Sequence, residues 1–276
     1  MAHTVSFTVD SPAGRRTVGV AYERAGSGEP LVLMHGIGHH RQAWDPVLRI
    51  LAAERDVIAL DLPGFGTSPS LPDGLPYDLR TMASVLSSFF DTLGVRRPHV
   101  AGNSLGGLLA LELGRRRLAR SVSALSPAGF WTESERRYAF GVLRAMRGAA
   151  LTMPLPLIDR LSRSAPGRTA LTSTIYARPG RRSPEAVVSE TVALRGATGF
   201  HGTLAAGRSA AFTDDVPGIP VTIAWGSKDL ILPRRQGVRA KHVIPGARLV
   251  RLPDCGHVPM NDDPAAVARI ILDTSR

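Results

Sequence analysis

The stretch Gly102-Asn103-Ser104-Leu105-Gly106-Gly107 stands between a short apolar run, residues 99–101, and a segment with helical character that begins at Leu105. A G-x-S-x-G pattern in this setting predicts a tight strand-to-helix turn whose serine adopts a strained backbone conformation. The flanking glycines avoid side-chain clashes in such a turn. The turn lifts the Ser104 hydroxyl clear of the sheet and sets it at a helix N-terminus, which stabilises developing negative charge. Ser104 is therefore the candidate nucleophile, and the alternative is a Gly-rich turn that serves packing only.

Short apolar runs recur along the chain and alternate with longer amphipathic segments, which indicates a mainly parallel sheet covered by helices. The clearest expected helix is 77–93, whose apolar side chains form one stripe. Two more are expected at 105–117 and 264–272, the second with Asp263 as N-cap and Pro264 in the first helical position. The expected strands are residues 31–34, 57–60, 99–101, 122–125, 221–225 and 249–252.

The alternation of strands and helices stops between residues 130 and 212. This stretch contains helical patterns, five prolines and no clear strand, and it carries 12 arginines against 5 acidic residues. The apolar strand pattern resumes at Val221. We interpret residues 130–212 as a helical insertion into a core formed by residues 1–129 and 213–276.

Two further residues provide the chemistry that a serine nucleophile needs. His257 follows the last expected strand, and imidazole has a suitable pKa to accept the serine proton near neutral pH. Asp229 follows the strand at 221–225, where a carboxylate can orient the imidazole and stabilise the imidazolium. The alternatives are a structural or exposed His257 and an Asp229 that only forms a turn with its own backbone.

The loop His35-Gly36-Ile37-Gly38 follows the expected strand at 31–34. A backbone N–H from this loop can join the N–H of the residue after the nucleophile to bind the oxyanion of a tetrahedral intermediate. We assign these two donors to Ile37 and Leu105. His35 is expected to pack the loop, and His39 and His40 are expected to be an exposed pair, with substrate contact as the alternative. Metal-ligand spacing is absent among the eight histidines, so no metal and no cofactor are expected.

Together these motifs resemble the α/β-hydrolase superfamily over nearly the whole chain. The resemblance implies an α/β fold with a mostly parallel eight-stranded sheet, flanking helices and a helical cap inserted after the sixth strand. It also implies the catalytic triad Ser104, Asp229 and His257, in the chain order expected of such enzymes. Asp61 resembles the acidic turn residue of the family, with a structural role. The matching motifs are residues 35–38, Asp61-Leu62-Pro63-Gly64-Phe65-Gly66, 102–107, 225–229 and 256–257.

Within the superfamily, the 102–107 motif is similar to that of the meta-cleavage-product hydrolases, which cleave carbon–carbon bonds in vinylogous diketo acids. Two departures favour another activity: Gly38 is followed by two histidines where a Pro-Gly pair is usual, and His257 is followed by valine where tryptophan is usual. We therefore predict hydrolysis of a small carboxylic ester through an acyl-enzyme on Ser104. Carbon–carbon hydrolysis, with Arg195 or Arg208 binding a substrate carboxylate, is the first alternative. A non-catalytic ligand-binding homologue is the second.

Composition narrows the remaining possibilities. The 276 residues are 43% hydrophobic, enough to bury a sizeable core, and the single cysteine, Cys255, excludes an internal disulfide. Neither a secretory signal nor a run of about 18 apolar residues is evident, which favours a cytoplasmic protein without a membrane span. The net charge of +11 comes from arginine, since only Lys228 and Lys241 are lysines. Aromatic residues do not interleave with the arginine runs, so the expected partner is a small-molecule substrate and not a nucleic acid. The oligomeric state stays open.

Overall fold

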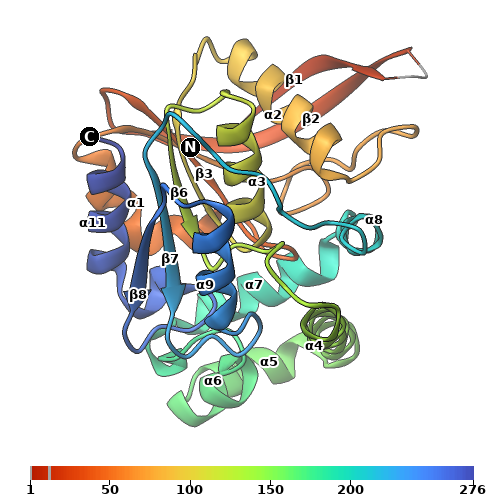
Figure 1. Cartoon of the computed structure of the whole chain (residues 1–276). Coiled ribbons are helices and arrows are strands. Elements are labelled where there is room, and N and C mark those ends of the chain that lie inside the picture. The colour runs from red at the N-terminus through yellow and green to blue at the C-terminus, as the bar shows by residue number, and fades with distance from the viewer. Residues whose placement is uncertain (1, 12–13) are drawn as a thin grey trace.

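The computed structural model describes residues 2–11 and 14–276, and the strands in these ranges form one eight-stranded sheet (Figure 1). The strand order is β1-β2-β4-β3-β5-β6-β7-β8. The β1–β2 and β2–β4 pairs are antiparallel and the other five pairs are parallel, which confirms the mostly parallel sheet. The strands are β1 (Ala2–Ser11), β2 (Gly14–Ala25), β3 (Pro30–Met34), β4 (Asp56–Leu60), β5 (His99–Asn103), β6 (Ser121–Leu125), β7 (Val221–Gly226) and β8 (Arg248–Leu252).

The six strands from β3 to β8 coincide with the apolar runs in the sequence, whereas β1 and β2 do not. In β1, exposed and buried side chains alternate along much of the strand, because only one face of this edge hairpin packs on the protein. Such a strand has too few apolar residues in succession to be recognised by an apolar run. The central strands β4, β5 and β6 are buried at every position.

Helices cover both faces of the sheet. On one face α1 (Asp45–Ala52) packs against α11 (Pro264–Thr274), whose first turn is capped by the Asp263 side chain as predicted. The other face carries α2 (Leu79–Thr92), α3 (Leu105–Arg115) and α9 (Arg235–Val243), which share one apolar core cluster. The short helices η1 (Arg41–Trp44) and α10 (Pro259–Asp262) lie in loops that follow β3 and β8.

The chain between β6 and β7 is helical. In Figure 1 these helices lie at the carboxyl end of β7, below the sheet in that view. The first of them begins with a capping box, in which Thr132 and Glu135 satisfy each other's backbone N–H groups. Its elements are α4 (Glu133–Thr152), α5 (Leu155–Ser162), α6 (Ala165–Thr172), η2 (Pro179–Arg181), α7 (Pro184–Gly196) and α8 (Phe200–Ala206).

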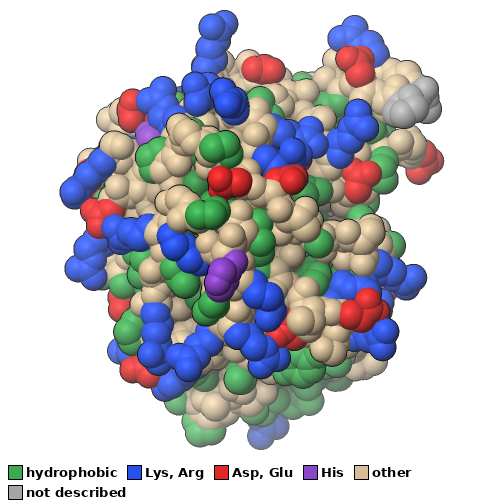
Figure 2. Space-filling model, viewed as in Figure 1, with side chains coloured by type: hydrophobic (Ala, Val, Ile, Leu, Met, Phe, Trp, Pro, Cys, Tyr) green, Lys and Arg blue, Asp and Glu red, His purple; other side chains and the backbone are tan. Residues whose placement is uncertain are grey.

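The basic residues that give the chain its net charge of +11 are spread over the surface (Figure 2). On the face seen in Figure 2, Lys and Arg side chains are scattered between acidic and apolar ones and do not gather into one patch. Across residues 2–11 and 14–276, helices fall short of the length and apolarity that crossing a bilayer requires.

Candidate active site

The turn at Ser104 has the strained geometry that the motif predicts. Ser104 lies between the end of β5 and the start of α3 with φ 55° and ψ −113°. Its backbone is fixed on both sides: its N–H donates to the Leu125 carbonyl at 3.0 Å, and its carbonyl accepts from Leu108 and Ala128. Strain of this kind persists only where the surrounding structure over-determines it, as it does here.

Two glycines permit the close packing around this turn. A Cβ atom on Gly102 would lie 2.0 Å from the Gly106 carbonyl oxygen, and one on Gly106 would lie 2.1 Å from that of Met34. Any side chain at either position would push the first turn of α3 away from the ends of β5 and β3. The same packing brings Gly36 so close that its added Cβ would lie 3.2 Å from the Ser104 Cβ. The 35–38 loop therefore runs directly beside the serine.

Asp229 and His257 form a buried pair. The His257 Nδ1 atom lies 2.9 Å from Asp229 Oδ2, while Asp229 Oδ1 accepts the N–H groups of Ile231 and Leu232. A carboxylate can only accept, so Nδ1 carries a proton, and in the neutral form of the ring Nε2 has the lone pair. This is the tautomer in which a histidine acts as a base through Nε2.

Ser104 and His257 line one cavity of about 40 Å³, together with His39 and Ile175, which we call the His257 cavity. No direct hydrogen bond joins the two side chains in the described structure. Bonds between a nucleophile and its base are often long before substrate binds. The structure thus joins Asp229 to His257 and turns both His257 and Ser104 toward the same small space.

Asn103 ties the His257 loop to the turn. Its side-chain amide donates to the backbone carbonyl of His257 at 2.8 Å and to that of Leu125 at 3.1 Å. No sequence pattern indicated this role for Asn103, because it occupies the variable position directly before the serine of the motif.

Asp262 fixes the same loop from the other side. Its fully buried carboxylate accepts the N–H groups of Gly256, Ala177 and Arg178, and the His257 N–H donates to the Ile175 carbonyl at 2.8 Å. A segment between α6 and α7 is thereby attached to the loop that carries His257. No sequence motif indicated this role for Asp262, because the groups it binds lie 6 and about 85 residues away.

The N–H groups of Ile37 and Leu105, which we assigned to the oxyanion, have no acceptor among the described residues. Leu105 is the first residue of α3, so its N–H has no partner within the helix. The Ile37 N–H is likewise without an acceptor there, and both residues line a pocket with Ser104.

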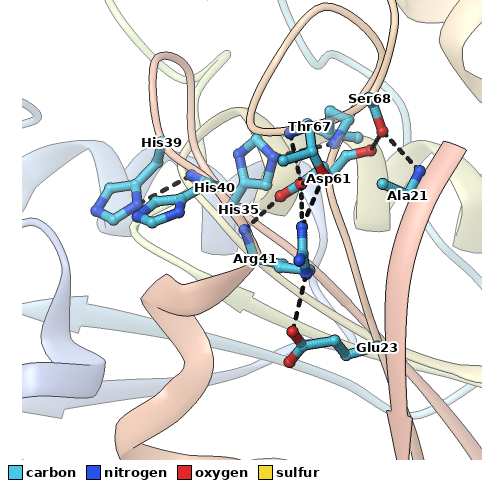
Figure 3. Close-up of polar contacts among 10 residues, drawn as sticks. Ala21, Glu23, His35, His39, His40, Arg41, Asp61, Thr67 and Ser68 are labelled. Carbon is cyan, nitrogen blue, oxygen red and sulfur yellow. Dashed lines mark hydrogen bonds and ion pairs between the residues drawn. The ribbon is translucent and has the colours of Figure 1, made fainter. Parts of the chain in front are cut away.

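A buried network supports the loop that contains Ile37 (Figure 3). His35 donates from Nδ1 to the Gly36 carbonyl and accepts the Leu62 N–H at Nε2, so both nitrogens are used. Asp61 is fully buried and accepts from the Arg41 backbone, the Arg41 guanidinium and the Thr67 N–H. Burial alone would raise the pKa of Asp61, but His35, the two backbone donors and Arg41 outweigh it, and this pKa lies below its ordinary value. His35 and Asp61 thus have structural roles.

The structure corrects two expectations about the residues around the site. His39 and His40 are not an exposed pair: His40 is buried and the His39 side chain is only 11% exposed. Burial lowers the pKa of His39 well below its ordinary value and that of His40 to about 4, so both rings are neutral. Arg195 is engaged by the carbonyls of Ala150 and Met153, and Arg208 is exposed, so neither lines a cavity near Ser104.

Four cavities lie at or near Ser104. The first, which we call the apolar pocket, has a volume of about 70 Å³ and adjoins Ser104. Its lining is largely apolar and includes Leu108, Trp131, Phe140 and Leu204. The His257 cavity adjoins the Glu190 cavity, of about 50 Å³, with which it shares His39, Met146 and Ile175. The helical cavity, of about 330 Å³ among α4, α5, α6 and α7, shares Glu190 with it. Within residues 2–11 and 14–276, no group of three or more His, Cys, Asp or Glu side chains is arranged to hold a metal ion.

Cys255 lies two residues before His257 but is expected to be chemically inert in the folded protein. It is buried, and burial, with Asp262 and Asp263 nearby, raises the pKa of its thiol to about 12. The thiolate is the form that attacks a disulfide reagent, and with this pKa it is scarce at pH 8. We expect no reaction with a disulfide reagent at pH 8 until denaturant is added, when one thiol should react per chain. Rapid labelling of the native protein would contradict this.

Comparison with known proteins identifies the family and the fold. Residues 31–270 match the model of a family described as the alpha/beta hydrolase family. Lipase 1 of Psychrobacter immobilis is 26% identical over 249 residues, which cover 85% of this chain and 73% of the lipase. An esterase of Thermogutta terrifontis has a similar structure, with TM-score 0.76, 22% identity and coverage of 98% of this chain and 97% of the esterase. A mutant of the meta-cleavage product hydrolase CumD has TM-score 0.72, 19% identity and coverage of 98% and 97%.

Proposed function

The chain belongs to the α/β hydrolase family, and from this premise we propose that it hydrolyses small carboxylic esters through an acyl-enzyme on Ser104. The observation that carries the proposal is the buried Asp229–His257 pair, whose free Nε2 belongs to a ring lining the same cavity as Ser104. A serine, a histidine and an aspartate related in this way fit nucleophilic catalysis of acyl transfer.

In the proposed reaction, His257 Nε2 takes the Ser104 proton as the serine oxygen attacks the ester carbonyl. The N–H groups of Ile37 and Leu105 donate to the resulting oxyanion, and Asp229 stabilises the imidazolium. The imidazolium then protonates the departing alcohol, which leaves an acyl group on Ser104. Water, activated by the same imidazole, attacks the acyl-enzyme and releases the acid.

This mechanism assigns the two sides of the site. The leaving oxygen must receive its proton from His257, so the alcohol part of the ester belongs on the side of the His257 cavity. The acyl part then occupies the apolar pocket, which Ser104 and Leu105 line and His257 does not. The small volume and apolar lining of that pocket support a short, unbranched acyl chain. Helices α4 to α8, within residues 130–212, form the proposed cap over both sides.

Carbon–carbon hydrolysis of a dienone acid is the second candidate, favoured by the similarity of the 102–107 motif and by the structural similarity to CumD. Such a substrate carries a carboxylate, for which a pocket usually offers an arginine. None of the four cavities is lined by arginine. The absence of arginine from these linings favours an ester substrate over a dienone acid. The third possibility, a homologue that only binds a ligand, is disfavoured because the chain retains Ser104, Asp229 and His257.

A direct comparison of substrates tests the proposal. We expect 4-nitrophenyl esters of acetic to hexanoic acid to be hydrolysed and an organophosphonate to modify Ser104, while a dienone acid of the meta-cleavage type is left intact. Cleavage of the dienone acid without ester hydrolysis would support the second candidate. A folded protein that does not react with the phosphonate and cleaves neither substrate would contradict both candidate functions.

A further inference from the structure

A carboxylate that the proposed reaction does not use lies near the catalytic residues. Glu190, in α7, has a side chain that is only 10% exposed, and it lines both the Glu190 cavity and the helical cavity. A buried carboxylate is costly unless its oxygens are hydrogen-bonded or ion-paired. The contacts of each oxygen therefore indicate what Glu190 is available to bind.

All the contacts from the protein converge on one oxygen of Glu190. Oε1 accepts the Tyr176 hydroxyl at 2.8 Å and forms a short ion pair with the Arg182 guanidinium. Arg182 also lies over the Tyr176 ring, 5.3 Å from its centroid, so the guanidinium is held on two sides. The His39 Nε2 atom lies 3.9 Å from the same Oε1. Oε2 has no hydrogen bond or ion pair with any residue that the structure describes.

The side chains around Glu190 do not donate to Oε2, although Arg182 Nε is itself buried without a hydrogen-bond partner in the described structure. His39 Nδ1 accepts the His40 N–H at 3.1 Å, so the ring proton is on Nε2, which faces the Tyr176 oxygen at 3.4 Å. The Tyr176 hydroxyl donates in turn to Oε1, and burial, which raises its pKa to about 12, keeps that proton in place. Oε2 is therefore open to a donor from water or from a substrate group in the Glu190 cavity.

The proposed function determines which part of a substrate would supply this donor. Because the alcohol part of the ester belongs on the His257 side, an elongated alcohol extends through the His257 cavity past His39 into the Glu190 cavity. On the basis of that proposed function, we propose that Glu190 Oε2 accepts a hydrogen bond from a hydroxyl on the alcohol part, so that the preferred substrates are monoesters of diols or polyols. Arg182 already balances the charge of Glu190, which favours a neutral hydroxyl over an ammonium group.

Three series of butyrate esters test this assignment. The alcohol is a straight alkyl chain of two to six carbons that ends in a methyl group, a hydroxyl or a methoxy group. A hydrogen bond to a carboxylate is strong, so the wild-type protein is expected to have about tenfold higher kcat/KM for the hydroxyl ester than for the alkyl ester at the chain length that reaches Oε2. The methoxy oxygen can only accept a hydrogen bond, so the methoxy ester should have no higher kcat/KM than the alkyl ester.

Two variants separate recognition from folding. In Glu190→Gln, Arg182 and Tyr176 retain the amide oxygen, so the amide NH₂ faces the cavity. The amide can donate to either oxygen, so the hydroxyl ester should keep only a reduced advantage over the alkyl ester, while the methoxy ester should rise several-fold to a similar level. Structural damage alone would not produce that gain. Glu190→Asp keeps the charge but withdraws the oxygen, and should lose the preference for hydroxyl without a gain for methoxy. Glu185→Gln, the same change at an exposed position of α7, serves as the matched control and should keep it.

The outcomes distinguish this inference from the proposed function. Alkyl esters hydrolysed with no preference for a hydroxyl at any chain length would overturn the role of Glu190 and leave the ester activity intact. A preference that survives in both Glu190 variants would also overturn it. If none of the esters is hydrolysed, the proposed function fails and this inference fails with it.

Discussion

Replacing Ser104 with alanine is expected to lower kcat for an ester by about 10⁵-fold, with little change in stability. The alanine keeps the Cβ atom and removes the oxygen that would form the acyl-enzyme, so the covalent route is lost. The remaining activity would come from the oxyanion donors and from substrate binding alone. Steady-state rates with a 4-nitrophenyl ester, and the mass increase that an organophosphonate causes in the wild type, measure the effect.

Ser126 provides a matched control for this variant. It is fully buried, it follows the carboxyl end of neighbouring β6, and its hydroxyl has no hydrogen-bond partner within the described structure. Ser126→Ala should therefore retain wild-type activity and the phosphonate reaction. Full activity of Ser104→Ala, or phosphonate modification at another serine, would refute Ser104 as the nucleophile.

The second large effect concerns stability. Asp61→Asn is expected to lower the free energy of unfolding by about 3–5 kcal/mol, because it removes the charge that faces the buried Arg41 guanidinium. An amide also turns one acceptor into a donor, which opposes the donors of Arg41 or Thr67. For a chain of this size the loss corresponds to a fall in Tm of about 10 °C. Urea and thermal unfolding followed by circular dichroism measure both quantities.

Asp159→Asn is the control for that measurement. Asp159 pairs with Arg163 on the surface of α5, and such an exposed pair is worth less than about 1 kcal/mol. Its Tm should stay within a few degrees of the wild type. Equal stability of Asp61→Asn and Asp159→Asn would show that the buried network around the 35–38 loop contributes little to stability.

The sequence was informative where a function depends on local backbone geometry. The turn at Ser104 needs glycines on both sides, so its pattern is visible in six consecutive residues, and the structure shows the strained φ at that serine. The central strands could be located because both of their faces are buried, which makes them continuous apolar runs. The edge hairpin of β1 and β2 escaped the same criterion because only one of its faces packs.

The sequence was uninformative where partners lie far apart in the chain. His39 was expected to be exposed, yet it is covered by Tyr176 and Glu190, which lie about 140 and 150 residues later. No local pattern specifies such an encounter, since it depends on where the helices after β6 pack. Asp262 and Glu190 were overlooked for the same reason, although each is an acidic residue in a largely buried environment.

The attachment of the Asp262 carboxylate to Ala177 and Arg178 has a consequence for engineering. The helices between β6 and β7 do not constitute an interchangeable module, because part of their backbone anchors the loop that bears the imidazole. A chimera that exchanged this region for that of another hydrolase would have to reproduce two adjacent amide groups at the same spot. Without them, an exchange intended to alter selectivity would displace the proposed base, His257, and reduce turnover for every substrate alike.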